Sequence, residues 1–185
     1  MNTIINFPCS KEWLVKEVVK NIPEFDRYIE PFFGSGAMFF NLFYYFPPKK
    51  SIINDIIEEY VLVVKVVKEN VDEVIRELMK FKTDKETYER VKNEIVEDEI
   101  KRAVNFIYLS EMSWGNLVRY NKYGRISSCI NKGMIGKKLR LNHLRRISMY
   151  LSLIDFEIKS VDYREILKET KEKDFIYLDP PYLLN

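Results

Sequence analysis

The sequence predicts an α/β protein whose strand–helix alternation is interrupted by a long insertion. Short apolar segments typical of buried strands alternate with helical patterns near both ends of the chain. A glycine-containing turn follows the first of these strands and precedes an apolar helix, as in nucleotide-binding βα units. The alternation stops in residues 71–153. We therefore predict one domain formed by residues 1–70 and 154–185, with an inserted segment between them.

The composition is that of a globular protein with a substantial core, since 46% of the 185 residues are hydrophobic and 14% are aromatic. No apolar run is long enough to span a bilayer, and residues 1–7 lack the basic start and apolar stretch of a signal peptide. The two cysteines, Cys9 and Cys129, are far apart and form neither a disulfide framework nor a metal-binding pattern. We predict a cytoplasmic protein with no membrane partner and no metal.

The predicted nucleotide-binding turn lies between a strand at residues 27–30 and a helix at residues 37–46, after a first helix at residues 12–21. Its glycines, Gly34 and Gly36, permit positive φ angles and a close approach of the backbone to a ligand. The turn lacks the Gly-Lys-Ser/Thr ending of a P-loop, so a triphosphate ligand is not expected.

Asp55 follows a second predicted strand at residues 51–54, about 20 residues after the glycine turn. An acid at this position is suited to accept hydrogen bonds from both ribose hydroxyls of a nucleoside ligand. It is also suited to cap the helix predicted at residues 56–69. The sequence leaves both roles open.

The insertion is predicted to contain helices at residues 71–81, 84–96, 98–112 and 141–153, with a long ordered loop or hairpin at residues 113–138. Long loops of this kind in compact domains are usually functional. Cations and aromatic residues are interleaved in this loop, a composition that suits phosphate and base contacts in nucleic acids.

The net charge of +2 hides a basic segment, because no acidic residue occurs between Glu111 and Asp155, where nine arginines and lysines are found. Subtracting these nine charges leaves −7 for the rest of the chain. Positive charge concentrated in this way indicates a polyanionic partner. The single histidine, His143, is predicted to have a structural or phosphate-contacting role rather than a catalytic one. We predict nucleic-acid contacts from Arg119, Asn121, Lys122, Arg125, Lys132, Lys137, Lys138 and Arg140.

The α/β pattern resumes with a strand at residues 156–161, Asp162, a helix at residues 164–171 and a strand at residues 175–178, which we predict to be buried on both faces. The chain then reaches Asp179-Pro180-Pro181-Tyr182, where two prolines remove backbone donors and impose a stiff, extended corner. A carboxylate, a free carbonyl and an aromatic ring in fixed relation suit a planar, amino-bearing group such as a nucleobase. The alternative is a proline-terminated strand with a solvated aspartate.

Five motifs occur in order along the chain. They are Phe7-Pro8-Cys9-Ser10-Lys11, with Cys9 where glycine is usual, residues 28–37, Asn54-Asp55, residues 114–124, and Asp179-Pro180-Pro181-Tyr182. Together they resemble the DNA adenine methylase (Dam) family of S-adenosylmethionine-dependent amino-methyltransferases. The resemblance covers nearly the whole chain.

The resemblance implies a Rossmann-like methyltransferase sheet with a target-recognition insertion. It implies methyl transfer from S-adenosylmethionine to the N6 amine of adenine in double-stranded DNA, after the base has flipped out of the duplex. The implied catalytic residues are Asp179, Pro180, Pro181 and Tyr182. The residues implied at the cofactor are Phe7, Lys11, Glu30, Phe32, Gly34, Ser35, Gly36, Asp55 and Asp162.

Two departures from the family pattern leave alternatives open. Residues 126–138 match poorly, so a recognised DNA sequence does not carry over. Family members continue beyond the catalytic motif, so we expect an amino-terminal portion that alone binds cofactor weakly and methylates little or no DNA. A second chain that supplies the remainder, or a partner restriction endonuclease, is compatible with this expectation. The alternatives are an RNA adenine methyltransferase, a cytosine-amine methyltransferase, which Asp179 disfavours, and a non-catalytic remnant that binds DNA or cofactor.

Overall fold

The computed structural model describes residues 3–5, 12–45 and 47–181. The contacts within the chain divide it into two compact units. The sheet unit is built mainly from Ser10–Val61 and Ser152–Asn185, and the helical unit mainly from Leu62–Leu151. Each unit has its own buried core.

The sheet unit contains four parallel strands in the order β3-β2-β1-β4. They are β1 (Arg27–Glu30), β2 (Lys50–Asn54), β3 (Phe156–Lys159) and β4 (Asp174–Ile176). Strands β1, β2 and β3 are added in succession on one side, and the chain then returns to the other side of β1 to form β4. Parallel strands joined through helices confirm the predicted α/β, Rossmann-like fold class.

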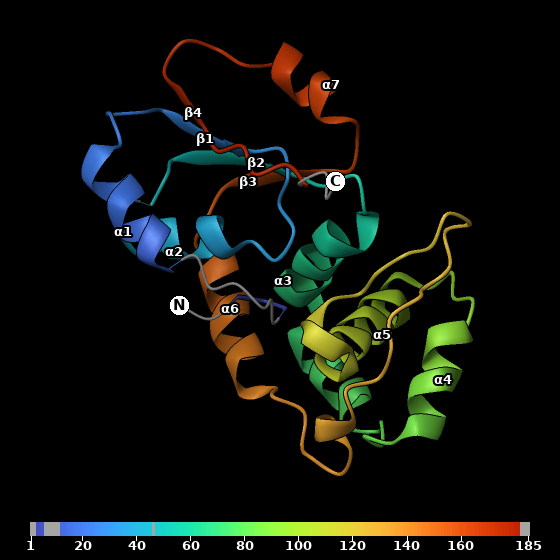
Figure 1. Ribbon diagram of the computed structural model, residues 1–185. Coiled ribbons are helices and arrows are strands. Elements are labelled where there is room, and N and C mark those ends of the chain that lie inside the picture. The colour runs from blue at the N-terminus through green and yellow to red at the C-terminus, as the bar shows by residue number, and fades with distance from the viewer. Residues whose placement is uncertain (1–2, 6–11, 46, 182–185) are drawn as a thin grey trace. The chain divides into compact units, whose positions relative to one another are not determined.

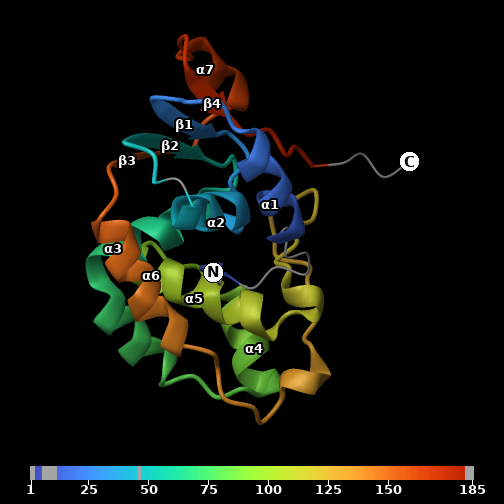
Figure 2. The same cartoon turned by 90° about the vertical axis from the view of Figure 1, so that its left-hand side faces the viewer.

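Helices cover both faces of this sheet (Figures 1 and 2). The short helix α7 (Tyr163–Lys168) lies on one face, and α1 (Glu12–Asn21) and α2 (Ala37–Tyr45) lie on the other. Helix α2 begins directly after the glycine turn. That turn is therefore held between the central strand β1 and a helix packed on the sheet.

The alternation of side chains along β1 accounts for these two layers, because successive residues point to opposite faces. Ile29 points to the α7 face, where it forms an apolar cluster with Ile52 and Ile166. Tyr28 points to the opposite face, where the centroid of its ring lies 6.2 Å from that of Phe39 in α2. Tyr28 and Ile29 are both fully buried, so β1 runs through the centre of the core of this unit.

The prediction that residues 175–178 form a strand buried on both faces is wrong. Strand β4 is an edge strand of the described sheet, its residues are half-buried, and Leu178 is 52% exposed. A short apolar run fits an edge strand as well as a central one, and periodicity does not separate the two. Arg27 of β1 holds this edge by donating hydrogen bonds of 3.0 Å and 2.6 Å to the two carboxylate oxygens of Asp174, which lowers the pKa of that carboxyl.

The helical unit consists largely of four helices. They are α3 (Glu58–Leu78), α4 (Lys85–Asn93), α5 (Glu99–Met112) and α6 (Asn142–Ser152). The break predicted near residue 70 is present inside α3, where Asn70 has non-helical angles (φ −135°, ψ 33°). None of the helices in the described part of the chain is long and apolar enough to cross a membrane.

The helical unit starts within α3, at Leu62, earlier in the chain than residue 71. The Lys65 ammonium pairs with Glu99 of α5 at 2.6 Å. The Ser148 hydroxyl of α6 donates to the carbonyl of Lys68 at 3.4 Å. The first half of α3 therefore belongs to this unit through its contacts with α5 and α6, which no local sequence pattern indicates.

Candidate active site at the carboxyl edge of the sheet

The carboxyl ends of the four parallel strands lie along one edge of the sheet, and the predicted site residues of this unit follow them. The loop of residues 31–36 follows β1, Asp55 follows β2, Asp162 comes after β3 and Asp179 comes after β4. The strand order reverses between β1 and β4. Open α/β sheets bind ligands outside the carboxyl ends of the strands at such a reversal. The topology therefore brings the glycine turn and the Asp179 corner to the expected binding edge.

Asn54, the last residue of β2, joins three of these loops. Its side-chain amide donates hydrogen bonds to the carbonyls of Pro31 (3.0 Å) and Val161 (3.1 Å), and its side-chain oxygen accepts one from the Val161 N–H (2.9 Å). Its backbone carbonyl accepts a hydrogen bond from the Phe33 N–H (2.9 Å). The sequence alone indicates no separate role for Asn54, although a polar residue that closes an apolar strand is a signal for one. This buried amide fixes how the loops after β1, β2 and β3 lie relative to one another.

The two glycines of the turn meet different constraints. Gly34 and Gly36 have φ angles of 51° and 69°, in the left-handed region that residues with a Cβ atom rarely adopt. A Cβ atom on Gly36 would lie 2.4 Å from Cζ of Phe33 and 2.7 Å from Cε2 of Phe40, so packing requires glycine there. A Cβ atom on Gly34 would meet no atom within 4 Å. Gly34 therefore borders open space at the binding edge, where a ligand can approach the backbone closely.

Replacing Gly36 with alanine is expected to destabilise the protein by about 2–4 kcal/mol, because the new methyl group overlaps two aromatic rings and strains the backbone. The matched change of Gly34 to alanine is expected to cost only about 1–2 kcal/mol, since similar φ strain arises there without a clash. Urea denaturation of the two variants measures the difference. Equal losses of unfolding free energy would contradict the packing constraint at Gly36.

Asp55 connects the glycine turn to the start of α3. Its Oδ2 accepts a hydrogen bond from the Gly34 N–H (2.8 Å), and its Oδ1 accepts one from the Ile57 N–H (2.9 Å). Burial raises the pKa of this carboxyl, and the two backbone hydrogen bonds oppose the rise. Each carboxylate oxygen has a second lone pair, so these contacts are compatible with further donors such as ribose hydroxyls. The bond from Ile57 supports the role at the helix start, and the ligand contact stays a prediction.

Glu30 provides a buried carboxylate at the end of β1, where it is 2% exposed. The Tyr28 hydroxyl, two residues earlier on the same face of the strand, donates a 2.8 Å hydrogen bond to its Oε2. Burial, together with the adjacent Glu30 charge, raises the pKa of Tyr28 well above its ordinary value, so the phenol stays protonated and continues to donate. A buried carboxylate beside the glycine turn is suited to a cationic group on a ligand.

The Asp179 corner continues the pairing of β4 with β1. One residue beyond β4, the Tyr177 N–H still donates to the Ile29 carbonyl (2.9 Å), so the chain runs parallel to the end of β1. Two residues later Asp179 is partly buried, and Pro180 and Pro181 are exposed. The structure therefore brings the catalytic carboxylate predicted from the sequence to the same edge as the glycine turn.

The other predicted residues of this unit differ in their surroundings. The Asp162 carboxylate is exposed and caps α7 by accepting a 2.9 Å hydrogen bond from the Arg164 N–H. The ring of Phe32 lies 5.1 Å from that of Tyr163, measured between centroids, which joins the loop after β1 to the start of α7. Ser35 is buried within the glycine turn. The residues that lie outside the described part of the chain, and whose roles stay predictions, are Phe7, Lys11 and Tyr182.

The basic loop of the helical unit contains a short hairpin. Tyr120 and Ile126 form an isolated antiparallel bridge across it. The side-chain oxygen of Asn121 accepts hydrogen bonds from the N–H groups of Tyr123 (2.9 Å) and Arg125 (3.1 Å), so Asn121 shapes the turn of this hairpin. The predicted nucleic-acid contacts are exposed or partly exposed, namely Arg119, Asn121, Lys122, Arg125, Lys132, Lys137, Lys138 and Arg140.

Buried groups hold the base of this hairpin in place. The hydroxyl of Tyr88, in α4, donates to the carbonyl of Ser128 (3.0 Å) and lies 3.0 Å from the Ser113 hydroxyl. The Ser128 hydroxyl donates to the Leu117 carbonyl (2.9 Å) and accepts from the Arg119 N–H (2.7 Å). Tyr88 is fully buried, so a polar network inside the unit orders a loop that has little strand structure of its own. The sequence analysis missed Tyr88, because its partners lie 25 and 40 residues away.

The basic segment between Glu111 and Asp155 has acidic neighbours that come from other parts of the chain. Arg140 Nε lies 3.3 Å from Oε2 of Glu111 in α5, and Arg145 Nη2 lies 3.0 Å from Oδ1 of Asp72 in α3. The first pair reduces the charge that Arg140, a predicted nucleic-acid contact, presents to a polyanion. Burial lowers the pKa of His143, whose Nε2 lies 3.4 Å from a backbone carbonyl, and both observations fit the predicted structural role.

Comparison with known proteins gives a match along nearly the whole chain. Residues 7–185 match the family described as D12 class N6 adenine-specific DNA methyltransferase. The chain is 30% identical to the Type II methyltransferase M.MjaIII of Methanocaldococcus jannaschii, with 93% of this chain and 66% of that protein covered. It is 29% identical to the Type II methyltransferase M1.LlaDCHI of Lactococcus lactis subsp. cremoris, with 94% and 63% covered. It is 26% identical to the DNA adenine methylase of Escherichia coli strain K12, with 91% and 60% covered. The chain thus spans about 60–66% of the length of these relatives.

Proposed function

Because the chain belongs to the D12 class N6 adenine-specific DNA methyltransferase family, we propose that the protein transfers a methyl group from S-adenosylmethionine to the N6 amine of adenine in double-stranded DNA. The observation that carries this proposal is the presence of the glycine turn and the Asp179 corner at one edge of the sheet, where the strand order reverses. Neighbouring strand ends can hold a methyl donor and a target base close enough to react. With DNA as the substrate, we propose a cytoplasmic reaction.

The residues around the glycine turn fit S-adenosylmethionine, which supplies an electrophilic methyl group when it is bound. Gly34 borders open space, so a ligand can approach its backbone closely, although its N–H already donates to Asp55. The buried Glu30 carboxylate is suited to the cationic amino group of the methionine part, and Asp55 to the ribose hydroxyls. The remaining residues that we propose at this site are Phe7, Lys11, Phe32, Ser35, Gly36 and Asp162.

The Asp179 corner is proposed to hold the target amine. The carboxylate of Asp179 and the carbonyl of Pro180 are both hydrogen-bond acceptors, so each can accept a hydrogen bond from one of the two N–H groups of the amine. Accepting both hydrogens favours a tetrahedral nitrogen, whose lone pair then leaves conjugation with the ring and points toward the methyl donor. Pro181 stiffens the corner, and Tyr182 is proposed to stack on the flipped base. Transfer of the methyl group would leave S-adenosylhomocysteine and a cationic methylated amine, and this cation is a strong acid that loses its proton without a histidine base.

Transfer of a tritiated methyl group from S-adenosylmethionine to defined oligonucleotides tests this function. In a full-length or complemented form of the protein, double-stranded DNA that contains adenine should be labelled, adenine-free DNA should not, and digestion should recover the label as N6-methyladenine. Label found only in RNA, or on cytosine, would contradict the proposed substrate. Binding of cofactor and DNA without any transfer would indicate a non-catalytic protein. A partner restriction endonuclease stays a prediction that co-purification can test.

The hairpin of the helical unit is proposed to contact DNA phosphates through Arg119 and Arg125. Neither side chain forms an ion pair with another residue in the described ranges, so both charges are available. Replacing either arginine with alanine is expected to weaken binding to all DNA sequences alike. The slope of log K against log salt concentration should decrease by about one unit for each phosphate interaction that the substitution removes.

Fluorescence anisotropy titrations between low and moderate salt measure this slope. Arg145→Ala is the matched control, because Arg145 lies in the same basic segment but is paired with Asp72. The control should leave the slope nearly unchanged. A slope that does not change in the Arg119 and Arg125 variants, or that changes equally in the Arg145 variant, would contradict the assignment of these contacts.

A further inference from the structure

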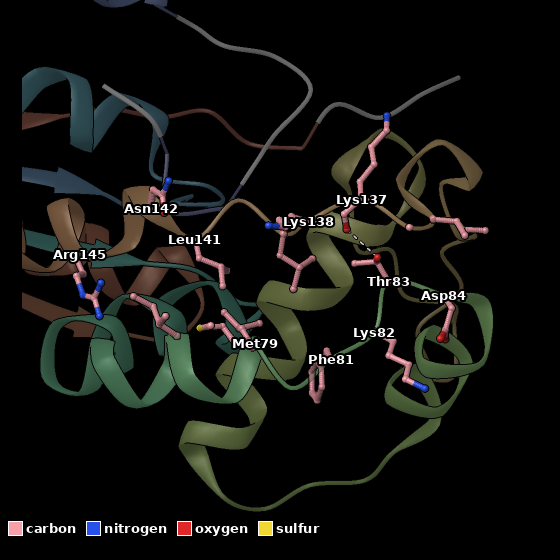
Figure 3. A pocket seen from close by; sticks show the side chains of 15 residues that line it. Met79, Phe81, Lys82, Thr83, Asp84, Lys137, Lys138, Leu141, Asn142 and Arg145 are labelled. Atoms are coloured by element: carbon pink, nitrogen blue, oxygen red, sulfur yellow. Dashed lines mark hydrogen bonds between the residues drawn. The ribbon is translucent and has the colours of Figure 1, made fainter.

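A cavity of about 810 Å³ lies within the helical unit (Figure 3). It is lined by the end of α3, the segment 81–84, the segment 135–139 and the start of α6. None of the residues proposed to bind the cofactor or the target base lines it. Its volume falls within the range of about 300–1,000 Å³ that is typical of small-molecule sites.

The floor of this cavity is apolar. Leu78 is fully buried beneath it, whereas Met79 and Ile135 are 73% and 46% exposed. In Figure 3, Met79 lies below Leu141, on the side of the cavity formed by α3 and the start of α6. Large apolar side chains that are this exposed in a concave surface favour an apolar ligand.

The walls of the cavity are held together by hydrogen bonds. The Gly136 N–H donates to the Thr83 carbonyl (2.9 Å), and the Thr83 hydroxyl donates to the Lys137 carbonyl (2.8 Å; dashed in Figure 3). The Tyr108 hydroxyl of α5 donates to the Lys82 carbonyl (2.8 Å). These bonds fasten the segment 135–139 to the segment 81–84, so the cavity is formed without a ligand.

The rim of the cavity is cationic. Lys82, Lys137, Lys138 and Arg145 line it, and Asp84 is the one acid among the described residues that do so. The Asp84 carboxylate accepts a 2.7 Å hydrogen bond from the Thr87 N–H at the start of α4, so it is already engaged in capping that helix. Arg145 is already paired with Asp72 and the Lys137 side chain extends away (Figure 3), so an anion at the rim is attracted mainly by Lys82 and Lys138 and opposed by Asp84.

Lys138 is the rim residue best placed to bind an anion. It forms no hydrogen bond or ion pair with any other residue of the described ranges. In Figure 3, Lys138 lies between Leu141 and Thr83, whereas the neighbouring Lys137 extends away from the other labelled side chains. Lys137 contributes its backbone to the wall through the bond from Thr83, and its ammonium group points elsewhere.

We propose that this cavity binds a small organic anion with an apolar body, whose acidic group pairs with Lys138 while its body covers Met79 and Leu141. A bare inorganic anion is not the best ligand, because it has no apolar surface to bury against the floor and so gains no binding free energy there. The cationic rim repels an organic cation and gives a neutral lipid no electrostatic attraction, whereas it attracts a carboxylate or a sulfonate. This inference does not depend on the proposed methyltransferase function.

Titration of the protein with 8-anilinonaphthalene-1-sulfonate, an aromatic body that carries one sulfonate, tests the proposal by fluorescence and calorimetry. Lys138→Glu should weaken binding by about tenfold or more, since the substitution removes a charge-assisted hydrogen bond and introduces a like charge. Lys137→Glu changes the charge of the protein identically, but should weaken binding less than about threefold, because its side chain points away from the cavity. Both lysines are exposed, and urea denaturation checks that both variants stay folded.

The neutral analogue 1-anilinonaphthalene separates anion recognition from general hydrophobic binding. It should bind about tenfold more weakly than the sulfonate and should not respond to Lys138→Glu. Equal binding of the two probes, or equal losses of affinity in the two lysine variants, would overturn the proposal. No saturable sulfonate binding at about 1 mM would also overturn it. If an acidic, apolar peptide binds while the sulfonate does not, the cavity is a protein-docking surface and the proposal is wrong.

Discussion

Replacing Asp179 with asparagine is expected to lower the rate of methyl transfer by at least about 10²-fold, the usual size of the effect when one preorganised polar group at a reacting centre is removed. The substitution keeps the size and shape of the side chain. It replaces one acceptor oxygen with an NH₂ group that repels the hydrogen of the target amine. The amine then keeps its conjugation with the ring and remains a poor nucleophile.

Single-turnover transfer of a tritiated methyl group measures this decrease, and calorimetry with S-adenosylhomocysteine checks the cofactor site. Cofactor affinity should change by less than about threefold, because the change removes an interaction with the base rather than with the cofactor. Asp26→Asn is the matched control. Asp26 is an exposed carboxylate immediately before β1, at the amino edge of the same sheet. A rate for Asp179→Asn within about threefold of that of the control would refute the catalytic role of Asp179.

Replacing Asn54 with alanine is expected to lower the unfolding free energy by about 2 kcal/mol or more, and to abolish measurable cofactor binding. The change removes three side-chain hydrogen bonds and leaves the Pro31 carbonyl and both backbone groups of Val161 without this partner. The buried Pro31 carbonyl left unpaired costs about 1–3 kcal/mol, and the two groups of Val161 add less because that residue is 38% exposed and water can reach it. The loops after β1 and β3 then have no common anchor, so the glycine turn is no longer aligned with the strand ends.

Urea denaturation and calorimetry with S-adenosylhomocysteine measure the two effects. Asn21→Ala is the control, because the exposed amide of Asn21 makes a single hydrogen bond to the Glu17 carbonyl within α1. Its replacement should cost no more than about 0.5 kcal/mol. A decrease below about 1 kcal/mol for Asn54→Ala, with cofactor binding intact, would show that the loops are held by other contacts.

The sequence predicted the elements of the fold with good accuracy where local chemistry determines them. Turn glycines, capping residues and the periodicity of hydrophobic residues predicted the helices that are observed as α1, α2, α5 and α6. They also predicted the break at Asn70. The same signals indicated Gly34, Gly36 and Asp55 as a candidate ligand-binding group, a role that stays a prediction, and they left the capping role of Asp55 equally open. In each case the relevant contacts lie within a few residues, or the residue type itself limits the conformation.

Other features were not accessible from the sequence. The apolar run at residues 175–178 did not reveal that the residues of β4 are only half-buried, because burial depends on which segments lie beside a strand. The composition of the basic segment did not predict that Arg140 pairs with Glu111 and Arg145 with Asp72, because these acids lie in other helices. Buried polar residues have no periodic pattern, since their partners are set by the path of the chain.

The sequence alone determined the α/β class, the order of the elements and the chemical groups of the predicted site, because these depend on residue type and on spacing along the chain. Only the tertiary structure decided that the strand order reverses between β1 and β4, which brings Gly34 and Asp179 to one edge. It also decided that Asn54 and Tyr88 anchor the loops of the two units. These features arise when segments distant in sequence meet, and their hydrogen bonds and packing exist only after the chain has folded.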